Sequence, residues 1–362
     1  MNIKTITRRL PFIIAIISPI VVTHYYINLF MPSGQGAVPV LIEFEQDAAF
    51  RQIANSLSEK GLIKDKTAFI LLARLRGSTR SAQAGEYEFS ASMSPARILE
   101  KLEKGLVVRH LVTIPEGYNI RDIADLLEKR GLCKKEKFLA KASDKAFLIP
   151  LGIDAPTVEG FLFPDTYNIY KGETEGAMII NMVSRFREAL TDDLKKRAVA
   201  AGLSINDLLT LASVVEKETG QASERPRIAR VFLNRLKKGM MLQSDPTVIY
   251  GIKDFNGNLT KKDLLTKTPY NTYRRRGLPA GPIANPGLDS IKAVLYPEHG
   301  PYLYFVSQNG GTHYFSKTLS EHNRAVYQYQ IAGRRNNTKK PRRHGEHGDD
   351  YSKIDKREEK SK

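Results

Sequence analysis

The sequence predicts an α+β protein in which an N-terminal transmembrane helix leads into a small duplicated α/β module and then into a larger, mixed α+β domain. Three observations predict this organisation. A long segment near the N-terminus carries no charged residue, and a pattern of strand and helix signals occurs twice, 70 positions apart. In the second half of the chain, capped helices alternate with loops rich in Gly and Pro.

The uncharged segment covers residues 10–30. Three basic residues precede it: Lys4, Arg8 and Arg9. As a helix the segment would extend for ~31 Å, which matches the thickness of a bilayer core. Because positive charge favours the cytoplasmic side, we expect residues 1–9 inside the cell and the rest of the chain outside. A cleaved signal peptide and a buried core helix are the alternatives.

A linker and a repeated unit follow the apolar segment. Residues 31–39 contain Gly, Ser and two Pro residues, which is typical of a linker. The first copy of the repeat lies within residues 40–112 and the second within residues 113–156. In each copy a strand-like run precedes a helix that ends at a glycine, and a second helix comes next. Four pairs of positions match: Ile53 and Ile123, Leu57 and Leu127, Gly61 and Gly131, Leu62 and Leu132.

The remainder of the chain, residues 113–333, is expected to form one mixed domain that includes the second copy. Helices are predicted at 175–197, 205–219, 225–238 and 288–295. Residues 302–306 and 312–315 predict a hairpin around an Asn-Gly turn, and a capping box at Thr318 begins the last helix. Residues 334–362 predict a basic, disordered tail.

The chain carries 56 Lys and Arg residues against 39 Asp and Glu, a net charge of +17. Such an excess indicates an anionic partner, which could be nucleic acid, membrane headgroups or a cell-wall polymer. Nucleic acid is not expected, because the basic residues are scattered and no known binding motif accompanies them. The single cysteine, Cys133, excludes an intrachain disulfide, and the histidines lack metal-ligand spacing. We therefore expect neither a metal nor a cofactor.

Glu218 continues the apolar face of a predicted helix. Four apolar residues form this face at helical spacing: Leu208, Leu211, Val214 and Val215. Burial and the negative end of the helix dipole would both raise the pKa of a carboxyl group in this position. A carboxylic acid with a raised pKa can protonate a glycosidic oxygen. Glu216 lies roughly 200° around the helix, and the alternative is that both glutamates are solvent-facing charges at a helix end.

The segment Leu211–Thr219 resembles the signature of the YceG-like (MltG) family of endolytic murein transglycosylases. Further segments resemble the motifs of this family in the same order: 159–166, 223–225, 231–236, 241–251, 270–273, 277–287 and 302–306. The resemblance extends from the apolar segment to about residue 332, and the repeat resembles the LysM-like part of the family. The chain differs from the family pattern at Ala280, where a proline is expected.

The resemblance implies that the second glutamate of Glu216-Lys217-Glu218 is catalytic, which is the residue that helical periodicity also selects. One acid is sufficient for this chemistry. Glu218 would protonate the leaving oxygen of a MurNAc–GlcNAc bond and then deprotonate the attacking MurNAc 6-hydroxyl, which leaves a 1,6-anhydroMurNAc end. A hydrolase uses two carboxylates instead. A lysozyme-like hydrolase and a wall-binding scaffold without activity are the alternatives.

Glycans present apolar ring faces edged by hydroxyl groups, so we expect aromatic and amide side chains to bind them. The residues predicted to form the groove are Gln243, Asp245, Tyr250, Tyr270, Asn271 and Tyr273. Supporting roles are expected for Glu159, Asp165, Glu216 and Asn234. Turn capping by Asp245 and a helix start at Asp165 are the structural alternatives.

The resemblance and the apolar segment together imply a location and partners. We expect a single-pass protein of the cytoplasmic membrane whose active site is periplasmic or otherwise extracytoplasmic. The implied substrate is the nascent glycan strand of peptidoglycan. The implied role is to terminate strand elongation, beside peptidoglycan synthases and the division or elongation machinery.

Overall fold

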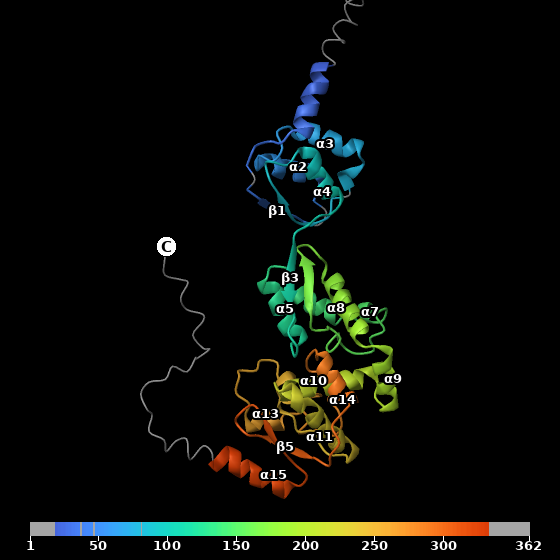
Figure 1. Ribbon diagram of the computed structural model, residues 1–362, viewed down its shortest axis with the longest axis vertical. Helices are drawn as coiled ribbons and strands as arrows, with labels where there is room; N and C mark the ends of the chain where they lie inside the picture. Colours follow the sequence, from blue (N-terminus) through green and yellow to red (C-terminus); the bar gives the residue numbers. More distant parts are fainter. Residues whose placement is uncertain (1–18, 37, 46–47, 81, 333–362) are drawn as a thin grey trace, which may run out of the picture.

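The computed structural model describes residues 19–36, 38–45, 48–80 and 82–332, and Figure 1 shows an elongated molecule whose parts follow one another in sequence order. A helix leads into a first α/β unit, a second α/β unit comes next, and a helical part ends the described chain. Helices predominate, and the described strands form three separate two-stranded sheets. The predicted α+β class is confirmed.

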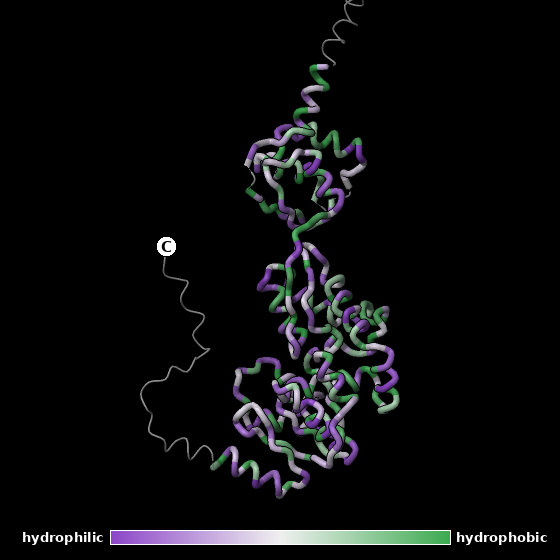
Figure 2. Tube along the Cα trace, viewed as in Figure 1, coloured by the Kyte–Doolittle hydropathy of each residue, from purple (hydrophilic) through white to green (hydrophobic). Residues whose placement is uncertain are grey.

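Residues 19–30 form a helix that projects from the first unit. Several of its apolar side chains are exposed: Ile20, Val21, Val22, Tyr26, Ile27 and Phe30. Figure 2 colours this stretch partly as hydrophobic. Within the described ranges no single helix is long and apolar enough to cross a membrane, and the helices Asp192–Ala200 and Ile205–Glu218 meet that test only as a pair bent by 93°. The predicted inside segment, 1–9, the first part of the predicted span, 10–18, and the predicted tail, 334–362, lie outside the described residues.

The two α/β units share the order strand, helix, helix, strand, and each contains one further helix at a different place. The first consists of β1 (Val40–Phe44), α2 (Phe50–Glu59), α3 (Lys66–Leu75), β2 (Gly85–Phe89) and the added helix α4 (Pro95–Glu103). The second consists of β3 (Arg109–Thr113), α5 (Ile120–Lys129), α6 (Lys135–Ala142), the short α7 (Lys145–Leu148) and β4 (Thr166–Tyr170). In each unit the first strand pairs antiparallel with the last. The sequence pattern missed β4, because an aromatic run interrupted by Gly and Pro precedes it.

A glycine ends the first helix of each unit in the predicted way. Gly61 has φ +69° and Gly131 has φ +66°, a left-handed conformation that glycine adopts without steric cost. In both units the next residue closes the turn, since Leu62 N donates to Leu57 O at 2.9 Å and Leu132 N donates to Leu127 O at 3.0 Å. The same local turn therefore directs the second helix in both copies.

The predicted helix over 175–197 is wrong as a single element. The structure contains α8 (Glu175–Ala189) and a separate α9 (Asp192–Ala200). Leu190 leaves the helical conformation with ψ 79°, and its side chain is buried. Asp192 and Asp193 then occupy the first turn of α9, where carboxylates interact favourably with the positive end of a helix. Continuous amphipathic periodicity concealed this new helix start.

The helix α10 (Ile205–Glu218) is the centre of the C-terminal part. Its N-cap Ser204 accepts a hydrogen bond from the backbone of Asp207, and all residues of 208–215 are buried. It packs against α11 (Arg225–Lys237) and α14 (Leu288–Leu295). The predicted helices in these three places are confirmed to within one residue at each end. Because the middle of α10 is buried on all sides, neighbouring elements also lie close to its last turn, where Glu216 and Glu218 are partly buried and Lys217 is exposed.

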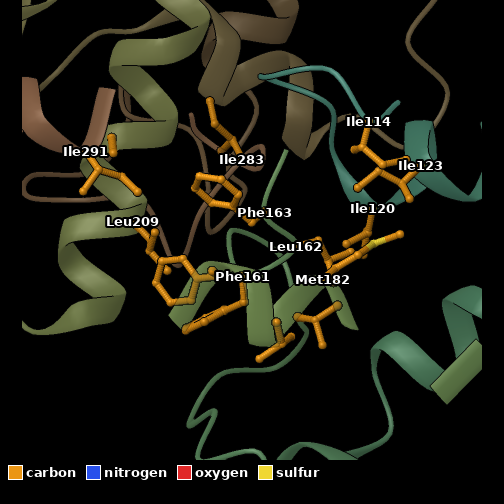
Figure 3. Packing of buried hydrophobic residues seen from close by; sticks show 14 of the residues in the cluster. Ile114, Ile120, Ile123, Phe161, Leu162, Phe163, Met182, Leu209, Ile283 and Ile291 are labelled. Atoms are coloured by element: carbon orange, nitrogen blue, oxygen red, sulfur yellow. The ribbon is translucent and has the colours of Figure 1, made fainter. Parts of the chain in front are cut away.

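The described residues form two hydrophobic cores. The first unit has its own core, which includes Phe69, Tyr87 and Phe89. The second core is shared between the second unit and the helical part. Figure 3 shows this shared core, in which Ile123 of α5, residues 161–163 and Leu209 of α10 lie in one cluster. The second unit is therefore packed onto the helices that carry the site described below.

The C-terminal region contains the predicted hairpin and last helix. β5 (Tyr304–Ser307) pairs with β6 (His313–Ser316), and the turn between them contains Asn309 at φ +62°. The helix α15 (Leu319–Val326) begins with a capping box and leads into a π-helical turn at Tyr327–Ala332. The other described elements are α12 (Asp245–Gly251), α13 (Lys261–Leu265) and 3-10 turns at Ser78–Arg80 and Ala222–Glu224.

Candidate active site

Glu218 is the last residue of α10, and it lines a cavity of about 330 Å³. We call this space the Glu218 cavity. Its walls come from α10, α11, α12, β5, α15 and the loop before α14. The other lining residues are Arg235, Leu242, Gln243, Asp245, Tyr273, Tyr304, Phe305, Leu319 and His322. Residues that are up to 104 positions apart in the sequence (218 and 322) thus meet around one carboxylate.

The Glu218 carboxylate is held by a hydroxyl group. Ser244 Oγ donates a hydrogen bond to Glu218 Oε1 at 2.5 Å. The Ser244 side chain is itself fixed, because the residue is buried and its backbone N–H donates to Thr272 Oγ1 at 3.0 Å. Ser244 is the N-cap residue of α12, so the position of that helix determines where the hydroxyl points. One carboxylate oxygen of Glu218 is thereby oriented toward α12.

Burial raises the pKa of Glu218 to about 7, and the negative charge of Asp245 acts in the same direction. The hydrogen bond from Ser244 and the charge of Arg235 oppose this rise. At neutral pH a substantial fraction of Glu218 is therefore a neutral acid, which can donate a proton. The interpretation of Glu216 and Glu218 as solvent-facing charges is wrong, because both residues are at least partly buried.

Three of the residues predicted for the groove line the Glu218 cavity. They are Gln243, Asp245 and Tyr273. Tyr273 donates its hydroxyl hydrogen to Asp245 Oδ1 at 2.6 Å. Gln243 has φ +51°, a conformation that non-glycine residues rarely adopt and that is frequent at functional sites. Its backbone N–H donates to Thr272 O at 3.2 Å, which connects this strained position to the loop that carries Tyr273.

The other three groove candidates lie outside the lining of the Glu218 cavity. Tyr250 donates its hydroxyl hydrogen to Glu159 Oε2 at 2.9 Å and packs edge-to-face with Tyr270 at 4.7 Å between ring centroids. Asn271 is fully buried, and its amide donates to the backbone oxygens of Leu264 and Thr266. Their substrate-binding role stays a prediction. In the described structure they support the loop that presents Tyr273.

Glu159 lies in the protein interior, where it joins distant segments. It accepts hydrogen bonds from Ile120 N at 3.1 Å, Tyr250 Oη at 2.9 Å and Asn285 Nδ2 at 3.0 Å. Burial raises the pKa of Glu159 to about 7, although the hydrogen bonds from Ile120 and Tyr250 oppose the rise. The contacts of Glu159 hold the second unit, α12 and the loop before α14 together.

Glu216 forms a buried ion pair beside the site. Arg225 Nη2 lies 2.8 Å from Glu216 Oε1, and their side chains are 10% and 5% exposed. The backbone N–H of Gly287 donates to Glu216 Oε2 at 3.0 Å. The next residue, Lys217, donates from Nζ to Gly117 O at 3.2 Å. The last turn of α10 is therefore held by α11, the loop before α14 and the second unit.

A second cavity, of about 320 Å³, lies at the last turn of α10 on the side of Glu216 and Arg225. It is lined by Glu116, Gly117, Glu216, Lys217, Glu218, Thr219, Gly220 and Arg225. Glu218 therefore lines both cavities. A polymer that occupied both spaces would pass Glu218 at an internal position of its chain.

Two further supporting candidates have structural contacts away from the Glu218 cavity. Asn234 donates its amide hydrogens to Gly300 O and Tyr302 O, both at 2.9 Å. Asp165 pairs with Arg185 at 2.6 Å and precedes β4, so it does not begin a helix. The hydrogen bond and ion pair with Arg185 lower the pKa of Asp165.

The structure adds site residues that the pattern did not single out. Arg235 is buried, donates to Leu303 O and Leu242 O, and lies 5.2 Å from the Tyr304 ring centroid. His322 stacks on the Tyr304 ring, at 5.2 Å between centroids. Burial and the charge of Arg235 lower the pKa of His322. Arg235 lies within a family-like segment, but His322 follows only an ordinary helix start, so no sequence signal pointed to it.

Known proteins resemble this chain over most of its length. A model of the YceG-like family matches residues 42–328. An endolytic murein transglycosylase of Bacillus subtilis (strain 168) is 33% identical over 305 residues, which are 80% of this chain and 84% of that protein. One from Streptococcus pneumoniae serotype 2 (strain D39) is 31% identical over 322 residues, which are 80% of this chain but 58% of that longer protein.

A solved structure supports the same relationship. The crystal structure of a YceG-like protein from Listeria monocytogenes matches with a TM-score of 0.56 and 33% sequence identity. The match covers 80% of this chain and 100% of that one. The family resemblance stated from the sequence is confirmed, and the chain belongs to the YceG-like family.

Proposed function

We propose that this chain cleaves the β-1,4 bond between MurNAc and GlcNAc within peptidoglycan glycan strands, with Glu218 as its acid and base. As a member of its family the chain is a lytic transglycosylase. The observation that carries the residue assignment is the position of Glu218, whose pKa of about 7 and place between two cavities suit a proton donor to an internal bond.

The proposed reaction needs no water molecule. The neutral Glu218 carboxyl group protonates the glycosidic oxygen, and the bond between that oxygen and C1 of MurNAc breaks. The resulting carboxylate then accepts the proton of the MurNAc 6-hydroxyl while the hydroxyl oxygen bonds to C1. The strand ends in 1,6-anhydroMurNAc, a new GlcNAc hydroxyl is released, and Glu218 regains its proton. A second catalytic carboxylate is not required, in contrast to hydrolases.

The cavity walls support binding of a sugar polymer. Tyr273 and Tyr304 contribute aromatic side chains to the walls, while Gln243 and Asp245 offer hydrogen-bonding groups for hydroxyls. The second cavity extends the available space beyond Glu218. Cleavage inside a strand requires sugar units on both sides of the broken bond, and this arrangement supports such an endolytic mode.

We also propose that the protein acts at the outer face of the cytoplasmic membrane and limits strand length there. The exposed apolar helix at 19–30 and the uncharged residues before it support a single-pass anchor. The two α/β units, which we consider LysM-like, would lie between membrane and active site. Termination of strand elongation beside peptidoglycan synthases follows from this location as an expectation, and unchanged strand lengths after deletion of the gene would contradict it.

The product ends provide the first test of this function. We expect purified, peptide-bearing glycan strands to yield internal cuts with 1,6-anhydroMurNAc ends when they are incubated with the full-length protein in detergent. Mass spectrometry distinguishes these ends from reducing ends by the mass of one water molecule. Reducing ends would support a lysozyme-like hydrolase, and intact strands in the presence of folded protein would support a wall-binding scaffold.

The pKa of Glu218 predicts the pH dependence of cleavage. The proton donor must be neutral in the free enzyme, and its pKa is about 7. We therefore expect kcat/KM to fall by about tenfold for each pH unit well above pH 7. Initial rates across pH 6 to 9, at ~0.15 M ionic strength, would measure this fall, which is the alkaline limb of the pH–rate profile. A profile that stays flat up to pH 9 would exclude Glu218, with this pKa, as the acid.

Two neighbouring substitutions should move this limb in opposite directions. Ser244→Ala removes a hydrogen bond that lowers the pKa of Glu218, so the alkaline limb should move to higher pH. Asp245→Asn removes a negative charge that raises the same pKa, so the limb should move to lower pH. The same initial-rate series would measure both variants. Shifts of equal sign would mean that another group determines the limb.

A further inference from the structure

The first α/β unit contains a cavity of about 450 Å³ between α2 and α3. It is lined by Arg51, Asn55, Lys66, Thr67, Ile70, Leu71 and Arg74. Three of these residues are basic and none is acidic. Among the described residues, none of the three forms an ion pair, and Lys66 Nζ donates instead to Asn55 Oδ1 at 3.2 Å. We call this space the basic cavity.

The sequence around the basic cavity is also rich in basic residues. Residues 51–80 contain seven Lys and Arg residues against two Asp and Glu. Asp65 is one of the two acidic residues, and its side chain caps α3 by accepting from Thr67 N and Ala68 N. The basic cavity is therefore complementary to an anionic ligand.

The duplicated unit provides an internal comparison. Phe69 and Phe138 are buried at the same place in α3 and α6, which aligns Lys66 with Lys135. In the second unit Lys135 pairs with Asp125 at 2.5 Å, whereas the first unit has Asn55 at the position of that aspartate.

Two more positions differ between the copies, one in charge and one in the size of an apolar side chain. Thr67 of the first unit corresponds to Glu136 of the second, and the exposed Leu71 corresponds to Ala140. The second copy thus has acidic residues, Asp125 and Glu136, where the first copy has Asn55 and Thr67, and only the first copy has a leucine at the third position. The common fold of the two units does not require either feature of the first copy.

The basic cavity lies at the end of the first unit that faces the N-terminal helix. His24 of that helix lies 3.5 Å from Asp65 at the start of α3, and Figure 1 shows α3 beside the helix. Leu71 and Leu75 are 42% and 78% exposed on α3. Basic side chains next to exposed leucines are typical of surfaces that contact the headgroup region of a membrane.

We propose that the basic cavity of the first unit binds the phosphate-bearing headgroups of anionic phospholipids, with Leu71 and Leu75 entering the membrane interface. The proposal rests on the membrane location proposed above. Docking would place the first unit flat against the bilayer and limit how far the active site can lie from it. Carboxylates of wall peptides offer a similar charge, but they would not explain the exposed leucines beside an apolar helix.

The natural chain contains no tryptophan, so one introduced tryptophan reports on one position. We would reconstitute the full chain carrying Leu71→Trp in phosphatidylcholine vesicles with and without phosphatidylglycerol, using lipids brominated in their acyl chains. We expect a blue-shifted emission and stronger quenching only when phosphatidylglycerol is present. The matched control is Ala140→Trp, an exposed site at the equivalent position of the second unit, which should show neither change.

A second variant tests the charge without disturbing the fold. Asn55→Asp with Thr67→Glu gives the first unit the residues that the second unit already accommodates. In the Leu71→Trp background we expect this pair to lower the ratio of docked to undocked protein by at least about tenfold. Equal quenching of Leu71→Trp in both lipid mixtures would overturn the proposal, and so would an emission change caused by soluble glycan peptides instead of lipid.

Flotation of the same samples separates this proposal from the anchor. Failure of the chain to float with pure phosphatidylcholine vesicles would contradict the proposed membrane anchor. If flotation then appeared with phosphatidylglycerol and was lost in the Asn55→Asp, Thr67→Glu variant, headgroup binding would still be supported. Flotation with both mixtures but no lipid-dependent quenching would support the anchor and overturn the docking.

Discussion

We expect Glu218→Gln to lower the rate of strand cleavage by at least about a thousandfold. The substitution removes both the proton donor and the later proton acceptor, while the side-chain carbonyl can still accept the hydrogen bond from Ser244 Oγ. The cavity keeps its shape, so binding of glycan strands should change little. Release of 1,6-anhydroMurNAc ends, followed by mass spectrometry, measures the rate, and sedimentation with purified peptidoglycan measures binding.

The same variant should be more stable than the natural protein at alkaline pH. The pKa of Glu218 is about 7 in the folded protein and has an ordinary value of 4.5. The stability associated with the neutral carboxyl group is fully present below about pH 4.5 and is lost as the pH rises through about 7. The amide of the Glu218→Gln variant does not ionise, so the gain in Tm over the natural protein should be larger at pH 8 than at pH 5.

This pair of measurements separates a catalytic role from a structural one. If Glu218 only maintained the fold, its substitution would lower the activity and the stability of the protein together. Full cleavage by Glu218→Gln would remove the residue from the mechanism and leave the family membership intact. Loss of cleavage with a lower Tm at every pH would indicate that Glu218 stabilises the last turn of α10.

The largest expected effect on stability is that of Arg225→Met, which should cost about 3–5 kcal/mol of unfolding free energy. Methionine replaces the aliphatic part of the arginine side chain but not its charge. The substitution therefore leaves Glu216, whose side chain is 5% exposed, without its cation. An unpaired buried carboxylate must either take up a proton or disturb the turn that holds Glu218. Urea unfolding followed by circular dichroism measures the loss.

A neighbouring arginine is the matched control. Arg227 on the same helix pairs with Glu298 at 2.9 Å, but these side chains are 40% and 35% exposed. We therefore expect Arg227→Met to cost less than about 1 kcal/mol. Adding Glu216→Gln to Arg225→Met should restore part of the lost stability, because it removes the unpaired charge. Equal losses for the two arginine variants would contradict the importance of burial.

The sequence determined the local elements where a signal lies within a few residues. The capping box at Thr318 and the helix-ending glycines at 61 and 131 occur as predicted. These features depend on hydrogen bonds between residues two to five positions apart, so a short window contains all the groups involved. The repeat was visible for the same reason, since each copy is built from such local turns.

Periodicity alone also placed Glu218 on an apolar face, and the structure encloses it there. It did not predict β4, the break between α8 and α9, or the separation of Tyr250 from the Glu218 cavity. For β4 and Tyr250 the deciding contact is distant in sequence: β4 pairs with β3, and Tyr250 bonds to Glu159 across 91 positions. Strand pairing and burial of a polar group depend on partners that no local pattern contains.

In the site, too, some features were visible in the sequence and others depend on the packing of distant elements. The residue types for proton transfer and sugar binding were present in the sequence, but their grouping was not. Ser244, Arg235 and His322 reach Glu218 or its cavity only because α11, α12, β5 and α15 are packed around the end of α10. The raised pKa of Glu218 is a consequence of that packing, because removal of water from a carboxylate requires walls that come from the whole C-terminal part of the chain.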